Sequence, residues 1–359
     1  PGYIEPFAST AQWSMDGHVT IWTTTQGTFD VREGTASILG IPESMLKVVA
    51  LECGGGFGGK GPNTNPLNPM AAILSQKSGL PVKMVMSRKE TFESTCPAAA
   101  TRIWIKMGAD KAGKITAAHM SLAYQSGAFP GSPVGAGIQN GLATYKVENI
   151  EIDGYDVITN TQKMQSYRAP GQPPATFAVE GVVDELAEKL GIDPIEIRLK
   201  NAAKEGTRRA DGTAYASIGC VEVLEALLDH PHYTAPLEGP NKGRGVAIGY
   251  WMNAGLQSSV NLAVNNDGTV GLTEGSPDIG GSRTSISMQA AEVLGIPAED
   301  FHPAVVDTDS IGWTFGTGGS RTTFATGMAA YEAAQDVKRQ MIARAALLWD
   351  ISINSIEWD

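Results

Sequence analysis

The feature that most constrains the fold is an order of short motifs that occurs twice in the chain. Each copy has an Asp-Gly turn, a β-rich stretch, a helical stretch, a Gly-Ile-Pro triplet, a second β-rich stretch and a glycine-rich loop. The landmarks are Asp16-Gly17, Gly40-Ile41-Pro42 and residues 54–59 in the first copy, and Asp267-Gly268, Gly295-Ile296-Pro297 and residues 316–319 in the second. The copies are offset by 251 residues at the Asp-Gly pairs and by 255 at the triplets. Such short motifs also recur by chance, but the conserved order of these features favours a duplication and two related halves.

The local patterns predict both strands and helices. β-Branched and aromatic residues indicate a strand at 18–25, and turn residues inside β-rich stretches indicate hairpins at 104–124 and 261–272. Apolar spacing and terminal glycines predict helices, at 70–78, 174–190, 285–294 and 325–348. We therefore expect an α+β fold of two related α/β halves, with mixed sheets and glycine-rich loops between them. The halves are expected at 1–207 and 242–359, the second incomplete at its C-terminus, with a proline-containing connector at 208–241.

Composition excludes several classes of protein. The formal net charge of −11 disfavours a nucleic-acid partner, and no apolar run is long enough to span a membrane. The chain starts at Pro1 without a secretion signal, so we expect a cytoplasmic, processed or truncated protein. Its three cysteines are far apart, which predicts neither a disulfide framework nor an iron–sulfur cluster held by this chain alone.

Residues 52–60, with the sequence ECGGGFGGK, form the most unusual segment. The glycines around Phe57 (Gly55, Gly56 and Gly58) leave consecutive backbone N–H groups unshielded, which suits a phosphate, an oxyanion or a sulfur-ligated metal centre. A dinucleotide-binding loop fits only loosely. A phosphate-binding P-loop would need Ser or Thr after Lys60, where this chain has Gly61.

Two near copies of a GGSRT segment precede predicted helices. Their backbone N–H groups, the positive helix ends and an arginine in each could hold phosphate or pyrophosphate. Alternatively, the serines only cap helices and the arginines pair with carboxylates. The candidate ligand-binding residues are Gly280, Gly281, Ser282, Arg283 and Thr284 in one copy, and Gly319, Ser320, Arg321 and Thr322 in the other.

Two single residues join this set. Gln26 follows the strand at 18–25, and Arg168 precedes a Pro-Gly turn and a helix. Taken alone, Gln26 would be a surface residue and Arg168 a member of a structural ion pair. The five histidines are not spaced as metal ligands, so we expect any metal to be held through a cofactor and by no protein ligand.

Together these segments resemble the molybdenum-binding subunit of the xanthine oxidase family, the molybdenum hydroxylases, truncated at both ends. The matching pieces follow one another in family order over nearly the whole chain. They are YIEPFAST (3–10), TTTQGT (23–28), GGGFGGK (54–60), SYRAPGQPPATFAVEGVVDELA (166–187), LGIDPIEIRLKN (190–201), DIGGSRTS (278–285) and GTGGSRTTFATGMAA (316–330).

The resemblance implies roles for particular residues. Gln26 would donate a hydrogen bond to a ligand of molybdenum, Phe57 and its flanking glycines would approach the metal, and Arg168 would lie near its oxo group. The two GGSRT segments would hold molybdopterin, alone or as its cytosine dinucleotide. The metal would be held through the pterin dithiolene, so that the protein supplies placement and electrostatics.

The resemblance also implies an activity and partners. The activity would be molybdenum-dependent hydroxylation of an aldehyde or an N-heteroaromatic compound, with oxygen derived from water. Electrons would pass to a [2Fe-2S] subunit and an FAD subunit, in a complex that forms a homo-oligomer and also contains the remaining segments of the molybdenum subunit. The alternative is a non-catalytic fragment that binds cofactor or assists assembly.

Four departures from the family limit this expectation. Gly61 and Pro170 stand where purine-oxidising members have a glutamate and a phenylalanine, and Ala169 stands where carbon-monoxide-oxidising members have a cysteine. These changes disfavour both substrates. The family's general base is a glutamate in a Gly-Glu pair, and this sequence has no such pair. We therefore expect the base to lie outside these 359 residues and the isolated chain to be inactive.

Overall fold

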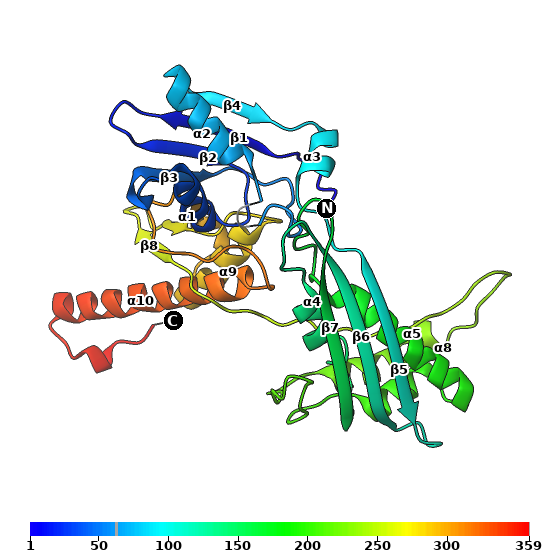
Figure 1. The fold of residues 1–359 in the computed structure, drawn as a ribbon. Helices are drawn as coiled ribbons and strands as arrows, with labels where there is room; N and C mark the ends of the chain where they lie inside the picture. The colour runs from blue at the N-terminus through cyan, green and yellow to red at the C-terminus, as the bar shows by residue number, and fades with distance from the viewer. Residues whose placement is uncertain (62–63, 359) are drawn as a thin grey trace. The chain divides into compact units, whose positions relative to one another are not determined.

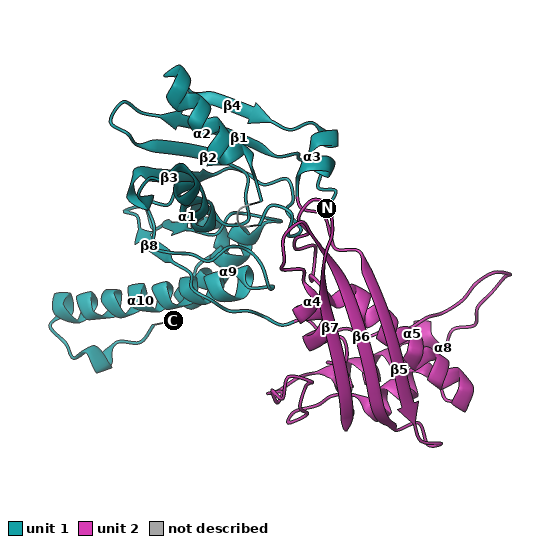
Figure 2. Ribbon diagram, viewed as in Figure 1, with its two compact units in different colours: residues 1–95, 252–359 teal, residues 96–251 magenta. Residues whose placement is uncertain are grey.

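The computed structural model describes residues 1–61 and 64–358. The chain forms two compact units, coloured separately in Figure 2. Unit 1 contains Pro1–Thr95 and Met252–Asp359, and unit 2 contains Cys96–Trp251. Unit 1 is therefore built from the two ends of the chain, and unit 2 from its middle.

The first motif copy folds into a four-stranded sheet in unit 1, with strand order β3-β2-β1-β4 (Figure 1). β2 pairs antiparallel with β1 and parallel with β3, and β4 adds antiparallel to β1. Its elements are β1 (Ala8–Trp13), β2 (Val19–Thr23), α1 (Thr28–Leu39), the short helix η1 (Glu43–Met45), β3 (Leu46–Ala50), α2 (Leu67–Ser78) and β4 (Val82–Val85).

The second copy repeats this arrangement in a three-stranded sheet of order β10-β9-β8, also in unit 1. β9 again pairs antiparallel with the preceding strand and parallel with the following one. Its elements are β8 (Val260–Val264), β9 (Val270–Glu274), α9 (Ser282–Leu294), η2 (Ala298–Asp300), β10 (Phe301–Val305) and α10 (Gly327–Trp349). The equal order and pairing confirm the duplication predicted from the motifs.

The two Gly-Ile-Pro triplets have the same structural role. Gly40 and Gly295 end their helices in the left-handed conformation, with φ of 67° and 71°. Pro42 and Pro297 then precede the short helices that lead into β3 and β10. The helix predicted at 285–294 begins three residues earlier, because Gly281 provides its N-cap.

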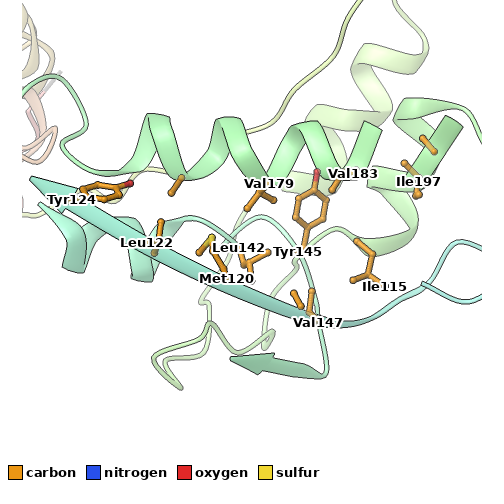
Figure 3. Close-up of a cluster of buried hydrophobic side chains, with 13 residues drawn as sticks. Ile115, Met120, Leu122, Tyr124, Leu142, Tyr145, Val147, Val179, Val183 and Ile197 are labelled. Carbon is orange, nitrogen blue, oxygen red and sulfur yellow. The ribbon is translucent and has the colours of Figure 1, made fainter. Parts of the chain in front are cut away.

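Unit 2 is a three-stranded sheet with helix α5 packed against one face. β6 pairs antiparallel with β5 and parallel with β7. Figure 3 shows the buried cluster between β6 and α5, in which Met120, Leu122, Val179 and Val183 are fully buried. The elements are β5 (Thr101–Ala109), β6 (Ile115–Gly127), α4 (Val134–Asn140), β7 (Asn149–Ile158), α5 (Gln172–Leu190), α6 (Pro194–Asn201), α7 (Cys220–Leu228) and α8 (Pro231–Thr234).

The stretch 208–241, expected as a connector, contributes α7 and α8 to unit 2, and Leu224 of α7 is fully buried. The boundary at residue 207 between two cofactor-binding halves stays a prediction, because the compact units reflect packing alone. The remaining helical segments, all in unit 1, are α3 (Arg88–Ser94), η3 (Thr322–Thr326) and η4 (Ile353–Ser355). Within the described chain, no helix is both long and apolar enough to cross a membrane.

Candidate functional site

The glycine segment at 54–59 forms an open nest of backbone donors in unit 1. Phe57 lies in its middle with a φ of 51°, and its side chain is about half exposed. Among the described residues, no hydrogen bond occupies the backbone N–H groups of Gly55, Gly56 and Phe57. Gly56 is itself buried, but unpaired N–H groups of this kind suit an anionic or electron-rich ligand.

Gln26 holds this nest to the second motif copy. Its Oε1 accepts a hydrogen bond from the Gly58 N–H at 2.8 Å, and its Nε2 donates to the Thr317 carbonyl at 2.7 Å. The backbone takes part as well, because the Thr317 N–H donates to the Gln26 carbonyl at 2.6 Å. A Cβ atom on Gly56 would lie 2.5 Å from Gln26 Oε1, so only glycine lets the nest approach this side chain. Gln26 is thus buried between two glycine loops and is not a surface residue.

Lys60 anchors the end of the nest from inside the protein. Its fully buried ammonium donates to Glu5 Oε2 at 2.5 Å and to Thr24 Oγ1 at 3.2 Å. The same Glu5 oxygen accepts the Gly54 N–H at 2.8 Å. Both ends of the loop are therefore tied to one carboxylate, which makes the nest a fixed structure.

The first GGSRT segment begins helix α9. Asp278 accepts hydrogen bonds from Ser282 Oγ at 3.0 Å and from Arg283 Nε at 2.7 Å, with a longer contact of 3.4 Å from the Arg283 N–H. Arg283 also donates to Glu52 at 2.9 Å, which links α9 to the segment before the nest. Thr284 is exposed. The arginine thus pairs with carboxylates, as the alternative interpretation expected.

The backbone in front of α9 remains open. No described hydrogen bond uses the N–H groups of Gly280 and Gly281. A Cβ at either glycine would find no atom within 4 Å. An anion could therefore approach these two N–H groups at the positive end of α9, without help from Arg283.

The second GGSRT segment is organised around a buried arginine. Arg321 is completely buried and donates to three carbonyls, those of Gly255, Gln257 and Phe315, at 2.6–2.7 Å, and to Ser258 Oγ. Gly319 and Ser320 are partly or fully exposed beside it, and Thr322 is buried and bonded to Thr317. This geometry gives the Arg321 guanidinium a structural role and leaves the loop backbone for a ligand.

Arg168 lies in unit 2, in a strained turn before α5. Arg168, Ala169 and Gly171 all have positive φ angles, of 22°, 54° and 85°. At Gly171 a Cβ would lie 2.1 Å from the Pro133 carbonyl, and the Tyr124 hydroxyl donates to the Gly171 carbonyl at 2.7 Å. Two non-glycine residues in this region cost free energy, which is typical of a functional turn.

The Arg168 side chain has no ion pair or hydrogen bond to any residue that the structure describes. It is exposed and lines a pocket together with Tyr124, Gln165, Tyr167 and Pro170. The structural ion pair considered for it is therefore not formed within the described residues.

One buried acid stands out near these loops. Glu274, the last residue of β9, is fully buried, and neither carboxyl oxygen has a hydrogen-bond partner among the described residues. Burial, followed by the negative charge of Asp278, raises its pKa from 4.5 to about 8, against an opposing effect of Arg283. Glu274 is therefore mostly protonated at neutral pH.

In the described part of the chain, one group of side chains could bind a metal ion directly. His119, Glu151 and Asp153 lie on β6 and β7 of unit 2, with their ligand atoms within 4.8 Å of one another. His119 Nε2 is 3.4 Å from Asp153 Oδ2. None of these residues belongs to the glycine loops.

The structure thus brings several of the expected site residues together within unit 1. Gln26 and the nest meet Thr317, and Arg283 meets Glu52. Sequence reasoning missed Thr317, Asp278 and Glu52 as members of this network. The contacts of Asp278 with Ser282 and Arg283 are local in sequence, whereas the contact of Thr317 with Gln26 has no local signature.

The chain belongs to the family of molybdopterin cofactor-binding domains. One such domain matches residues 1–202 and a second matches residues 230–359. These matches confirm the family resemblance inferred from the motifs. The loops fit such a group, because no described hydrogen bond occupies the backbone N–H groups of Gly55, Gly56, Phe57, Gly280 and Gly281, and such groups bind phosphate and oxo oxygens.

Two curated relatives and one solved structure illustrate the similarity. The chain is 32% identical to a putative xanthine dehydrogenase molybdenum-binding subunit of Escherichia coli, over 96% of this chain and 48% of that protein. It is 31% identical to an aldehyde oxidoreductase molybdenum-binding subunit of the same species, over 95% and 47%. The aldehyde oxidoreductase of Desulfovibrio gigas matches in structure with a TM-score of 0.84 and 26% identity, over 94% of this chain and 39% of that one. The chain spans about half the length of the curated relatives that it matches.

Proposed function

We propose that this chain forms the molybdopterin-holding part of a molybdenum hydroxylase. The observation that carries the proposal is the pair of hydrogen bonds from the Gln26 side chain, one to Gly58 and one to Thr317, which joins the nest at 54–59 to the loop at Thr317. The nest keeps backbone N–H groups that no described hydrogen bond occupies. Bound molybdopterin would supply two-electron oxidation with water as the source of oxygen.

The chain's own residues would bind and orient this group. The N–H groups of Gly55, Gly56 and Phe57 would face its metal end, and those of Gly280, Gly281 and Ser282 at the start of α9 would face its phosphate. Ser320 and the backbone around it would add further donors, with Arg321 holding their loop from behind. The second N–H of the Gln26 amide would remain for the metal's oxo ligand.

The relatives support a substrate class and the presence of partners. They are subunits of a xanthine dehydrogenase and of an aldehyde oxidoreductase, which supports an aldehyde or N-heteroaromatic substrate and further subunits. That these subunits carry [2Fe-2S] and FAD is part of the proposal. The cytosine dinucleotide form of the pterin and a homo-oligomeric complex belong to the same proposal. Three unpaired cysteines agree with a reducing compartment such as the cytoplasm.

A matched pair of glycine variants tests the proposal. In Gly56→Ala the added methyl group would lie 2.5 Å from Gln26 Oε1, which forces the nest and Gln26 apart. Gly181→Ala is the control, because it lies in helix α5 with no atom within 4 Å of the new Cβ. The chain is produced with its partner subunits in cells that make the cofactor, and molybdenum and pterin are quantified per folded protein.

We expect near-stoichiometric molybdenum and pterin in the wild type and in Gly181→Ala, and at least a tenfold loss in Gly56→Ala, since misplaced donors weaken each contact by about 1–3 kcal/mol. Dye-linked oxidation of aldehydes and N-heterocycles then separates an enzyme from a cofactor-binding fragment without turnover. Wild-type protein that lacks pterin, or a Gly56→Ala variant with full pterin content, would contradict the proposal.

A further inference from the structure

The sheet of unit 2 presents polar side chains on the face opposite its buried cluster (Figure 1). Met120 and Leu122 of β6 point into that cluster, so His119 points to the opposite face, because successive side chains alternate along a strand. Glu151 is paired with His119 in the ladder, and Asp153 follows on the same face; both are exposed. The outer face of the sheet therefore brings a histidine and two carboxylates from two strands into one group.

The pairing of β6 with β7 fixes how far apart these three side chains lie. Their ligand atoms are within 4.8 Å of one another, and His119 Nε2 is 3.4 Å from Asp153 Oδ2. Two ligand atoms that each lie about 2.0–2.2 Å from a zinc ion in tetrahedral geometry are roughly 3.3–3.6 Å apart. The separations in this group therefore require only small side-chain rotations for the three ligand atoms to meet at one ion.

The two carboxylates have little else to bind. Among the described residues, no hydrogen bond or ion pair uses the Glu151 carboxylate, and the Asp153 carboxylate contacts His119 alone. On β5, the Trp104 ring packs edge-on against the His119 imidazole, with ring centroids 5.0 Å apart and an interplanar angle of 79°. Lys106 is the partner of His119 on β5, so one positive charge borders the two negative ones. The imidazole is thus held in place beside two available carboxylates.

The donor atoms indicate which class of ion the group would take. Oxygen ligands alone suit Mg²⁺ or Ca²⁺, whereas an imidazole nitrogen favours zinc and the other late first-row divalent metals. Zinc accepts a mixed set of histidine nitrogen and carboxylate oxygen, and three protein ligands leave a further position for water.

We propose that His119, Glu151 and Asp153 form a zinc site that links β7 to β6. β7 is an edge strand in which Ile150 and Ile152 are half-buried and the other residues are exposed. A bound ion would add a second link between this strand and β6, beside their hydrogen-bonded ladder. The site lies within unit 2 and contains no residue assigned to the pterin, so the inference does not depend on the proposed function.

This inference departs from the expectation that any metal is held only through a cofactor. The spacing of the histidines along the chain did not indicate the group, because His119 and Asp153 are 34 positions apart. The register of the parallel ladder is what brings them together.

The test is equilibrium dialysis of the 359-residue chain, first stripped with EDTA, against Zn²⁺ as the probe. The wild type is compared with His119→Ala and Glu151→Gln. His18→Ala is the matched control, because His18 Nδ1 is 3.2 Å from Asp16 Oδ2 in an exposed pair that no third ligand completes among the described residues. Zinc bound by the three free cysteines is common to all four proteins and cancels in the comparison.

Glu151→Gln is the decisive variant. If His119 and Asp153 form only a surface ion pair, Glu151 takes no part in it and the substitution changes nothing. If Glu151 is a ligand, the substitution removes a charged oxygen donor from the ion. Circular dichroism without zinc checks that each variant folds, which is expected because the substituted side chains lie on the surface.

We expect the wild type to bind one Zn²⁺ more than His119→Ala, and Glu151→Gln to bind it at least about tenfold more weakly, since even an outer-shell partner of a metal is worth that much. His18→Ala should bind zinc as the wild type does. Zinc should also slow amide hydrogen exchange in peptides that cover residues 149–158 of the wild type and of His18→Ala, but not of the other two proteins.

Two results would overturn the inference. One is a wild type that binds no more zinc than His119→Ala, and the other is a Glu151→Gln variant with the affinity of the wild type. Neither result changes the pterin content of the protein, so the proposed function is tested separately.

Discussion

The two motif copies of unit 1 share one architecture but stabilise their glycine loops in different ways. In the first copy, Lys60 and Glu5 hold the two ends of the nest, and the strand end at Thr23 has its hydrogen bonds satisfied. In the second copy, Arg321 is surrounded by carbonyls and Glu274 is buried without a partner. The comparison indicates that one copy is built for rigidity, whereas the other contains a group whose charge can change.

The largest expected effect comes from replacing Arg321, the buried arginine that holds the glycine loop of the second copy. Arg321→Met would remove the buried donor of three carbonyls and of one hydrogen bond to the Ser258 hydroxyl. We expect a loss of more than about 3 kcal/mol in the free energy of unfolding, measured by urea denaturation. Arg339→Met, at an exposed arginine paired with Asp336, should change it by less than about 0.5 kcal/mol. If the two substitutions changed the free energy of unfolding equally, the structural role assigned to Arg321 would be wrong.

A smaller and opposite effect is expected at Glu274. Its pKa is raised from 4.5 to about 8 in the folded protein, so folding favours the protonated form. The contribution of this group to stability is therefore most favourable below pH 4.5 and declines as the pH rises towards 8. Glu274→Gln removes this decline and should stabilise the protein by roughly 2–3 kcal/mol at pH 7, with little effect near pH 4.5.

Thermal or urea unfolding across this pH range measures the effect. One outcome would contradict this prediction: the glutamine variant is less stable than the wild type at pH 7, and its free energy of unfolding changes with pH as that of the wild type does. The acid would then be stabilised by a partner, and the contrast between the two copies would disappear.

The smallest effect is expected at the equivalent position of the first copy. Thr23→Val keeps the shape of the side chain but removes the hydrogen bonds to Ala8 and Asn65. We expect a loss of about 1 kcal/mol that does not depend on pH, since no group titrates there. A pH-dependent loss would mean that the two strand ends are more alike than their hydrogen bonds indicate.

Much of unit 1 could be predicted because its signals are local. The turns at Asp16-Gly17 and Asp267-Gly268, and the glycines at 40 and 295 that end helices, depend on backbone conformations that few residues adopt. Their repetition was therefore visible in the sequence. The helices of 208–241 were missed, because the charged residues of this stretch and the prolines at 231, 236 and 240 favoured a connector.

The candidate site was only partly predictable for a related reason. The glycine loops can be recognised from their composition, but the partners of Arg283 and Arg321 cannot. Arg283 binds Glu52, which lies 231 residues away, and Arg321 binds carbonyls at 255 and 257 that carry no side-chain signal. Whether an arginine faces a ligand or the protein interior depends on such long-range packing, which residue type alone cannot reveal.

The hydrogen bonds between Gln26 and Thr317 have a consequence for how the chain reaches its native state. Residues 291 positions apart must meet before the nest is fixed, and unit 1 needs segments from both sides of unit 2. During synthesis, the continuous unit 2 can fold while the first 95 residues still lack their counterpart. The nest beside the first sheet cannot form its contact with Thr317 until residue 317 has emerged from the ribosome. The candidate site is therefore among the last parts of the chain to form.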